Sequence, residues 1–418
     1  MYKRLLGKPL QFFGNKLQID VNYFAWGTIY TGIQQVIGII CGFIVTYLFA
    51  NFISKTVYGE YNLVLSILSI ITFLSLPGID TALIQSVGQG YEASFPNAVR
   101  MKIKFSFLGS VALLGFALFY FISAKITIAT SLIFIALIYP FLYSFSLTTP
   151  FLTAKRLFRL LTKLSSLSSV GFLIISALSI FLFPTALGIT AGYTLGLIVP
   201  GMLGFIYALR FINKSSHTDP DLVSYSSFLT LISVLPWISS YLGQIILGTS
   251  IGPQSLAVFS IANGFLASVQ KSFIVFYKPI TAKLAAQSSK QHLSTLRTHG
   301  LKFVTIGVLL SVGLWICVPL LIKYFFPLYP EAISYGQVLS LSLIPLPLTW
   351  VLSDMMIYQK SKKVQVVASS IPHLIKILLY VLLVPKYGIW GLVFVTLFDR
   401  YSSLIIYLYP LSHKLLKK

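Results

Sequence analysis

Long apolar segments alternate with short polar connections along the whole chain. Most of these segments hold about 17 to 25 residues, the length that an α-helix needs to cross the hydrocarbon core of a bilayer. About twelve are predicted, near residues 23–49, 63–87, 105–122, 129–149, 166–183, 187–207, 227–249, 256–276, 303–325, 334–357, 366–384 and 389–410. The pattern therefore predicts an all-α membrane protein.

The composition agrees with this fold class. Of the 418 residues, 56% are hydrophobic and 10% are charged, whereas an ordinary soluble domain has about 25% charged residues. Cys41 and Cys317 both fall in apolar segments, where a free cysteine behaves as a small hydrophobic residue. Neither a disulfide framework nor a metal site is predicted, and no cofactor is expected.

The basic residues gather in alternate connections. A net charge of +22 would suit a nucleic-acid partner, but this distribution along the chain argues against one. The basic clusters lie at residues 3–16, 100–104, 155–163, 210–214, 271–302, 360–363 and 414–418, and the connections between them hold only Lys55, Lys125, Lys323 and Lys386. Such a bias marks the cytoplasmic side of a membrane protein, so an inner-membrane protein with both termini in the cytoplasm is predicted.

One polar connection resembles a domain linker. It runs from Asn213 to Asp221 and divides the predicted spans into six plus six. We expect a first lobe at residues 1–212, a linker at 213–226 and a second lobe at 227–418. Equal halves joined in this way are typical of duplicated membrane transporters.

Glycine and proline residues mark helices that pack closely or bend. Gly38 and Gly42 lie four residues apart in the first span, and small faces of this kind let helix backbones approach each other. Prolines fall within several spans, where each removes a hydrogen-bond donor and kinks the helix. Two interpretations stay open: static packing with fixed kinks, or hinges that move.

Lys376 is the most unusual residue, because it lies inside the apolar segment 366–384. A charged side chain at the bilayer centre costs about 2.5 to 3.5 kcal/mol on insertion scales and usually faces a protein interior or a water-filled path. His373 shares its helical face. Asp399 and Arg400 are adjacent in the last span and diverge by about 100° on a helix. Lys376 either forms a buried ion pair with Asp399 or, with Arg400, binds an anionic substrate.

Other polar residues are weaker candidates. His373 can titrate and couple transport to protons, or stay neutral and hydrogen-bonded. Lys271, near the inner end of its span, either attracts an anion or extends its ammonium to the interface. Gln34 and Gln35 either bind sugar hydroxyls or hold helices together.

Two acids are candidates for gating. Asp80 follows a Pro-Gly pair, so it either takes part in a gate or forms a local turn hydrogen bond. Asp354 lies near the predicted cytoplasmic end of the tenth span, where we expect it to pair with a basic loop.

Three sequences resemble one known family. They are the segment from Gly32 (Gly-Ile-Gln-Gln-Val-Ile-Gly-Ile-Ile), Tyr58-Gly-Glu-Tyr-Asn-Leu63 and Leu76-Pro-Gly-Ile-Asp-Thr-Ala-Leu83. Together with span count, orientation and split halves, they resemble the polysaccharide transport branch of the multidrug/oligosaccharidyl-lipid/polysaccharide exporter superfamily, which includes O-antigen flippases. Tyr58-Gly-Glu-Tyr61 is expected to form a tight external turn.

This resemblance implies a fold and a function. It implies a V-shaped pair of six-helix lobes around a central cavity that opens alternately to each side. The implied cargo is an undecaprenyl-diphosphate-linked oligosaccharide, moved outward by a flippase for synthesis of cell-envelope polysaccharide. Membrane lipids, a polysaccharide polymerase and chain-length proteins are the implied partners, and nucleic acid is not one.

Three other functions are compatible with a membrane protein of this kind. A membrane polymerase or ligase of glycans would need catalytic external loops, but these are short, and the sequence has no P-loop, His-Glu-x-x-His pattern or nucleophile elbow. A multidrug exporter of the same superfamily would favour carboxylates or aromatic cages for organic cations, whereas Asp399 is the one acid placed as deep as Lys376 and Arg400. A scaffold without transport activity would leave those deep charges unexplained.

Overall fold

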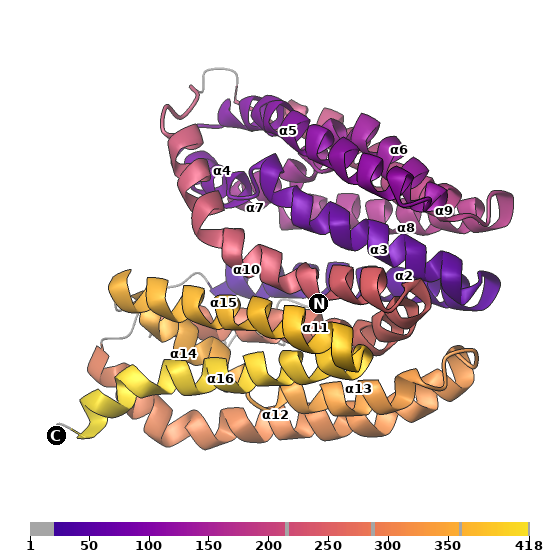
Figure 1. The fold of residues 1–418 in the computed structure, drawn as a ribbon. Coiled ribbons are helices and arrows are strands. Elements are labelled where there is room, and N and C mark those ends of the chain that lie inside the picture. The colour runs from indigo at the N-terminus through magenta and orange to yellow at the C-terminus, as the bar shows by residue number, and fades with distance from the viewer. Residues whose placement is uncertain (1–20, 214–216, 286–288, 359–361, 417–418) are drawn as a thin grey trace, which may run out of the picture.

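The computed structural model describes residues 21–213, 217–285, 289–358 and 362–416, and all regular elements in these ranges are helices (Figure 1). The α-helices are α2 (Val21–Phe52), α3 (Lys55–Ile71), α4 (Ile79–Gly88), α5 (Ser94–Ile122), α6 (Ile126–Leu142), α7 (Thr148–Ala154), α8 (Phe158–Leu182), α9 (Ala186–Ala208), α10 (Leu222–Ser250), α11 (Pro253–Ala285), α12 (Ser289–Phe325), α13 (Ala332–Ser340), α14 (Leu346–Tyr358), α15 (Lys362–Tyr387) and α16 (Ile389–Leu416). The all-α membrane fold class is confirmed.

Three of the predicted spans are interrupted. The second span consists of α3 and α4, the fourth of α6 and α7, and the tenth of α13 and α14, with short 3₁₀ turns between the two pieces of each. In the second span, Leu76 has a φ of 60°, which breaks the helix just before Pro77. Because apolar residues lie on both sides of each break, the sequence pattern predicted one continuous helix.

Eleven segments of the described chain are long and apolar enough to cross a membrane. Of the predicted spans, α11 is the one missing from this set. It carries Gln270 and Lys271 in its middle portion. These polar residues lower its mean hydropathy, which is expected of a helix that lines a cavity more than it faces lipid.

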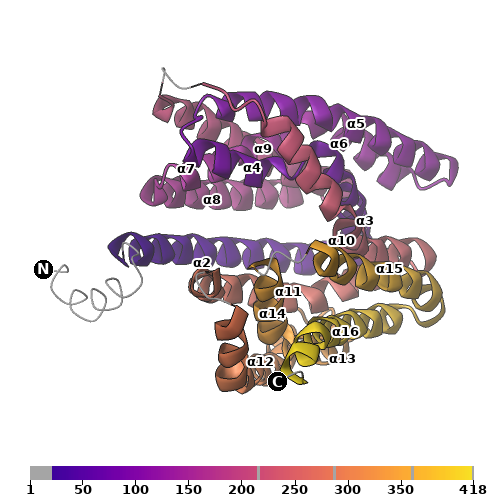
Figure 2. The same cartoon turned by 90° about the vertical axis from the view of Figure 1, so that its left-hand side faces the viewer.

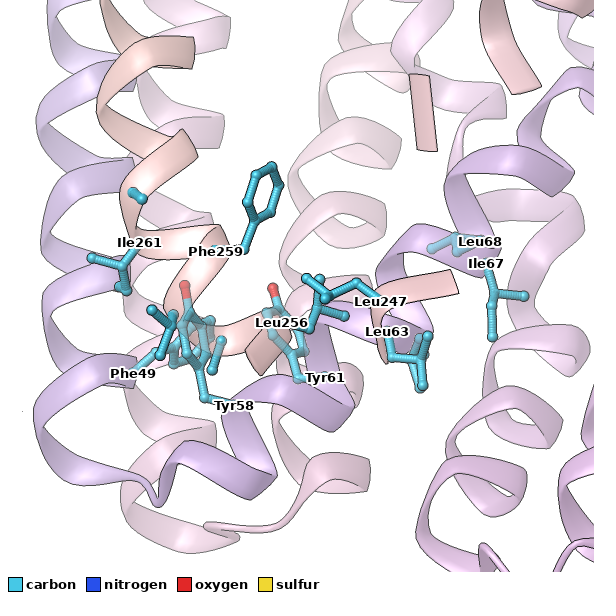
Figure 3. Close-up of a cluster of buried hydrophobic side chains, with 14 of the residues drawn as sticks. Phe49, Tyr58, Tyr61, Leu63, Ile67, Leu68, Leu247, Leu256, Phe259 and Ile261 are labelled. Atoms are coloured by element: carbon cyan, nitrogen blue, oxygen red, sulfur yellow. The ribbon is translucent and has the colours of Figure 1, made fainter. Parts of the chain in front are cut away.

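The helices form two lobes. In Figure 1, α3 to α9 lie above and α11 to α16 lie below, with α10 between them. Figure 2 shows α2 running along the boundary between the lobes. A hydrophobic cluster joins the two lobes, and in it the rings of Phe49 and Tyr61 pack edge to face with centroids 5.0 Å apart (Figure 3).

The lobes meet most closely where α3 and α11 begin. We call this end of the molecule the closed end; it comprises the connections between α2 and α3, α10 and α11, and α12 and α13, and lies on the right in Figure 1. A Cβ atom on Gly59 would lie 1.9 Å from the carbonyl oxygen of Pro253. Only glycine allows these two backbones to approach so closely.

The structure corrects one prediction at the closed end. Tyr58-Gly-Glu-Tyr61 does not form a turn, because α3 already begins at Lys55. The turn occupies residues 53–54, where the hydroxyl of Ser54 caps α3 by accepting a hydrogen bond from the Val57 backbone N–H at 3.3 Å. The motif therefore serves helix packing, through Gly59.

Polar contacts between the lobes surround the glycine contact. Gln254 Nε2 donates to Thr56 Oγ1 at 3.0 Å, and Asn51 Nδ2 donates to the carbonyl oxygen of Phe325 at 2.8 Å. Lys55 and Glu331 form an ion pair at 3.2 Å. The first helical hairpins of the two halves therefore contact each other directly.

Helix α10 contacts both lobes along its length. Toward the first lobe, Trp237 Nε1 donates to the carbonyl oxygen of Ser69 at 2.5 Å, and Thr230 Oγ1 accepts from the Gly78 N–H at 3.0 Å. Toward the second lobe, it packs against α15, where a Cβ on Gly243 would lie 2.9 Å from the Tyr380 ring. The helix is a shared wall between the lobes.

The described part of the linker contacts the first lobe. Helix α10 begins at Leu222, inside the predicted linker, and the Asp219 N–H donates to Ser94 Oγ at 2.8 Å. Lys155 Nζ donates to Glu92 at 2.5 Å, and the Asn213 N–H donates to the same carboxylate at 2.7 Å. Burial opposes the charge of Glu92, but these hydrogen bonds and the Lys155 charge together lower its pKa.

The division of the chain into a first lobe at residues 1–212 and a second lobe at residues 227–418 stays a prediction.

The lowered pKa of Glu92 predicts a pH-dependent stability. The ionised carboxylate is favoured in the folded protein, so its stabilisation is complete above the ordinary glutamate pKa of about 4.3 and is lost as the pH falls through the lower folded pKa. At pH 7, Glu92→Gln should reduce stability by on the order of 1 kcal/mol. Thermal unfolding in detergent at a series of pH values measures this.

The matched control is Glu331→Gln, which removes the more exposed ion pair with Lys55. Exposed pairs contribute about 0 to 1 kcal/mol, so the control should change the unfolding temperature less than Glu92→Gln does at pH 7. A loss of stability in Glu92→Gln that persists unchanged at pH 3 would show that the charge of Glu92 is not its source.

Candidate functional site

A large cavity of the described structure lies between α2, α11 and α12. We call it the central cavity; it has a volume of about 1,070 Å³. Its walls are mostly apolar and include Phe43, Leu310 and Phe326. Phe325 also lines it and accepts the hydrogen bond from Asn51, so the closed end forms one end of the cavity.

Two of the predicted site residues line the central cavity. Gln35 projects from α2 and Lys271 from α11. Lys271 is exposed, and among the described residues that line the cavity it is the one with a charge. Gln34, one position before Gln35, is not among them. An apolar cavity with one ammonium group and one amide suits an amphipathic molecule with an anionic group.

Lys376 and Asp399 form the buried ion pair that the sequence left as one of two alternatives. Lys376 Nζ lies 3.0 Å from Asp399 Oδ2, and the two side chains are 12% and 8% exposed. The same ammonium lies 5.9 Å from the centre of the Tyr380 ring. The pair therefore connects α15 to α16, and neither residue is among the described residues that line the central cavity.

Two polar atoms beside this pair lack hydrogen-bond partners in the described part of the chain. They are Asp399 Oδ1 and Arg400 Nε, and both are buried. Arg400 follows Asp399 on α16 and so projects in another direction. A buried guanidinium nitrogen without a partner has an unused donor, which a carboxylate, phosphate or water molecule could satisfy.

His373 and Asp354 are held by neutral groups. His373 Nδ1 shares a hydrogen bond of 2.8 Å with Ser239 Oγ on α10. Asp354 Oδ2 accepts a hydrogen bond of 2.7 Å from the Tyr277 hydroxyl on α11. The described contact of Asp354 is thus with a tyrosine, where the sequence suggested a basic loop. Both contacts join helices that are distant in sequence.

Asp80 forms an ion pair that the sequence did not reveal. Lys102 Nζ lies 2.7 Å from Asp80 Oδ1, and the lysine side chain is only 4% exposed. Lys102 was assigned to a cytoplasmic connection, but it lies inside α5, on a buried face with Val99 and Ser106. The sequence did contain a pattern that could have placed Lys102 on this buried face, because Val99, Lys102 and Ser106 are three and four residues apart and so share one side of a helix. The pattern was overlooked because Arg100 and Lys104 beside Lys102 are also basic.

The fold is shared with known membrane transporters. A multidrug resistance MATE family transporter of the MOP superfamily, in an outward-facing conformation, superposes with a TM-score of 0.62 at 14% identity, covering 91% of this chain and 93% of that one. The lipid II flippase MurJ, in an inward closed conformation, gives a TM-score of 0.61 at 15% identity, covering 93% and 87%. At these identities, the similarity shows the fold alone.

Sequence comparison gives the family. No curated protein sequence matches the chain. A model of the polysaccharide biosynthesis protein family matches residues 24–280, which is more than half of the 418 residues. The chain therefore belongs to the polysaccharide biosynthesis protein family.

Proposed function

We propose that this protein is a flippase that moves an undecaprenyl-diphosphate-linked oligosaccharide from the inner to the outer leaflet of the cytoplasmic membrane. The observation that carries the proposal is Lys271, an exposed ammonium in a largely apolar cavity of about 1,070 Å³. Family membership supports a role in polysaccharide synthesis. In this proposal Lys271 attracts the diphosphate, Gln35 bonds a polar group nearby, and the apolar walls accept part of the lipid.

Transport would proceed by alternating access. The contacts at the closed end comprise two hydrogen bonds, one ion pair and part of the hydrophobic cluster that joins the lobes, and opening at this end has to separate all of them. The positive-inside pattern places the closed end outside the cell and both termini in the cytoplasm. The structure would then represent a state that is closed to the outside, with Asp80 and Asp354 near the opposite end, where gating occurs.

A multidrug exporter is the second candidate, because proteins with this fold include multidrug transporters. An organic cation would favour a carboxylate or an aromatic cage, and the cavity does offer aromatic rings, since Phe43 packs edge to face with Phe325 and Phe326. Among the described residues that line the central cavity no carboxylate is present, and the one charge is positive. The positive charge of Lys271 therefore favours an anionic cargo.

A polysaccharide polymerase and chain-length proteins would be partners on the outer side, where the delivered glycan is used.

Removal of the Lys271 charge should weaken transport. We expect Lys271→Gln to raise the apparent KM for a fluorescent undecaprenyl-diphospho-oligosaccharide in proteoliposomes by about tenfold, the equivalent of about 1.4 kcal/mol. Lys323→Gln is the matched control, because Lys323 is exposed on α12 and does not line the cavity. Wild-type protein that exports an organic cation and not the lipid would contradict the proposal.

The Lys376 pair allows a second test. Lys376→Met should reduce the amount of folded protein, because it leaves Asp399 buried without its partner, a loss of about 3 to 5 kcal/mol. The double variant Lys376→Met/Asp399→Leu should recover folding and most of the transport if the pair is structural. If the double variant folds but does not transport, while Arg400→Ala is also inactive, then these cations bind the substrate, as the sequence alternative predicts.

A crosslink across the closed end tests alternating access. Thr56→Cys and Gln254→Cys replace two side chains that are in hydrogen-bond contact, in a chain with both native cysteines changed to serine. Oxidation should join the lobes and stop transport, and reduction should restore it. Each single-cysteine variant should keep transporting under oxidation. Full transport by the crosslinked protein would exclude opening at this end.

A further inference from the structure

A second cavity lies inside the first lobe. It has a volume of about 490 Å³ and lies between α2, α8, α9 and the connection from α6 to α7. We call it the lobe cavity. Its size falls within the usual range for small-ligand pockets, about 300 to 1,000 Å³. None of the residues in the previous proposals for substrate contact lines it.

Hydroxyl groups line the lobe cavity. Thr149, Ser165 and Ser168 are among its lining residues, and their hydroxyls make no hydrogen bond to another described residue. They differ from Ser169, whose hydroxyl donates to a backbone carbonyl of its own helix at 3.0 Å. Thr149 is exposed and the two serines are partly exposed, so these hydroxyls are available to bond water or a ligand in the cavity.

The other walls of the lobe cavity are aromatic and uncharged. Phe145, Phe172 and Tyr193 line it, and the rings of Phe172 and Tyr193 pack edge to face with centroids 5.6 Å apart. Among its described lining residues there is no acidic or basic side chain. Free hydroxyls beside aromatic rings suit a neutral polyhydroxylated ring, because hydroxyls bond hydroxyls and ring faces pack against the apolar side of a sugar.

Two glycines separate the lobe cavity from the central cavity. Gly38 and Gly42 of α2 line both cavities. A Cβ on Gly42 would meet no atom within 4 Å, and one on Gly38 would lie 3.9 Å from Ser169 Oγ. Neither glycine is therefore required for close helix packing. Both cavities therefore adjoin α2 at two positions where no side chain projects between them.

We propose that the lobe cavity binds neutral sugar residues of the glycan, which reach it from the central cavity past Gly38 and Gly42. This inference rests on the proposed function and deepens it. The diphosphate stays near Lys271 in the central cavity while the sugars distal to it contact the hydroxyl-lined wall. The lobe cavity then selects for uncharged sugars and for glycans longer than one residue.

A substitution at Gly42 tests the passage. Gly42→Leu adds a side chain where open space is available, so the protein should fold normally. It should reduce transport of a lipid diphosphate carrying a neutral oligosaccharide about tenfold, the equivalent of about 1.4 kcal/mol. Transport of the same lipid with one sugar should fall clearly less, because Gly42 also lines the central cavity but the single sugar does not need the lobe cavity. Gly115→Leu is the matched control, because Gly115 is exposed on α5 and also has no atom within 4 Å.

The two lipids separate the failure of this inference from the failure of the proposed function. If wild-type protein transports both lipids and Gly42→Leu impairs both equally or neither, the lobe cavity does not bind sugar. Ser165→Ala/Ser168→Ala should show the same selective loss as Gly42→Leu. Equal transport of both lipids by this double variant would also overturn the proposal.

If wild-type protein transports neither lipid, a binding measurement tests whether the lobe cavity binds sugar. Thr149 is exposed and lines the lobe cavity, and Cys317 is exposed and lines the central cavity. In a Thr149→Cys variant with both native cysteines changed to serine, a small methanethiosulfonate reagent should modify the introduced thiol, and free neutral oligosaccharide at twice its Kd should slow that reaction about threefold. In Cys41→Ser protein, the reaction of Cys317 should not change. An introduced thiol that the oligosaccharide does not protect would overturn the proposal.

Discussion

The arrangement of the two lobes depends on one backbone contact at the closed end. Gly59 lies so close to the carbonyl of Pro253 that no other residue fits there without moving a helix. Because α3 and α11 meet at this point, the interlobe hydrogen bonds from Gln254 and Asn51 can form beside it. The central cavity begins beside this end, at Phe325, and continues away from it between α2, α11 and α12. In the proposed alternating access, the closest packing would therefore lie at the place that opens.

The second constraint is the cost of charge in a membrane. Each lobe holds one buried lysine paired with an aspartate of a neighbouring helix, Lys102 with Asp80 and Lys376 with Asp399. A charge that is already paired has less attraction for a passing anion than a free one has. Lys271 is the deep cation that stays exposed in a cavity, so the candidate site lies on α11.

The sequence predicted the parts of the structure that follow from local patterns. Apolar length predicted about twelve spans, of which eleven are found in the described chain, and the last-span charges suggested the Lys376–Asp399 pair as one alternative. The ion pair of Lys102 with Asp80 was not predicted, because Asp80 lies on a different helix and the neighbours of Lys102 are also basic. The central cavity was not located, because α2 is far in sequence from α11 and α12. The role of Gly59 was missed for the same reason, since its close neighbour is Pro253 in the other half.

The pairing of the deep lysines has an electrical consequence. A lysine and an aspartate held about 3 Å apart form a neutral unit, and a neutral unit that moves through the membrane field does no electrical work. Moving one unpaired charge across the membrane is worth about 2.3 kcal/mol per 100 mV. The rocking of the lobes would therefore be nearly insensitive to voltage as far as these pairs are concerned. Any voltage dependence of the cycle would come from Lys271, Arg400 and the charge of the cargo itself.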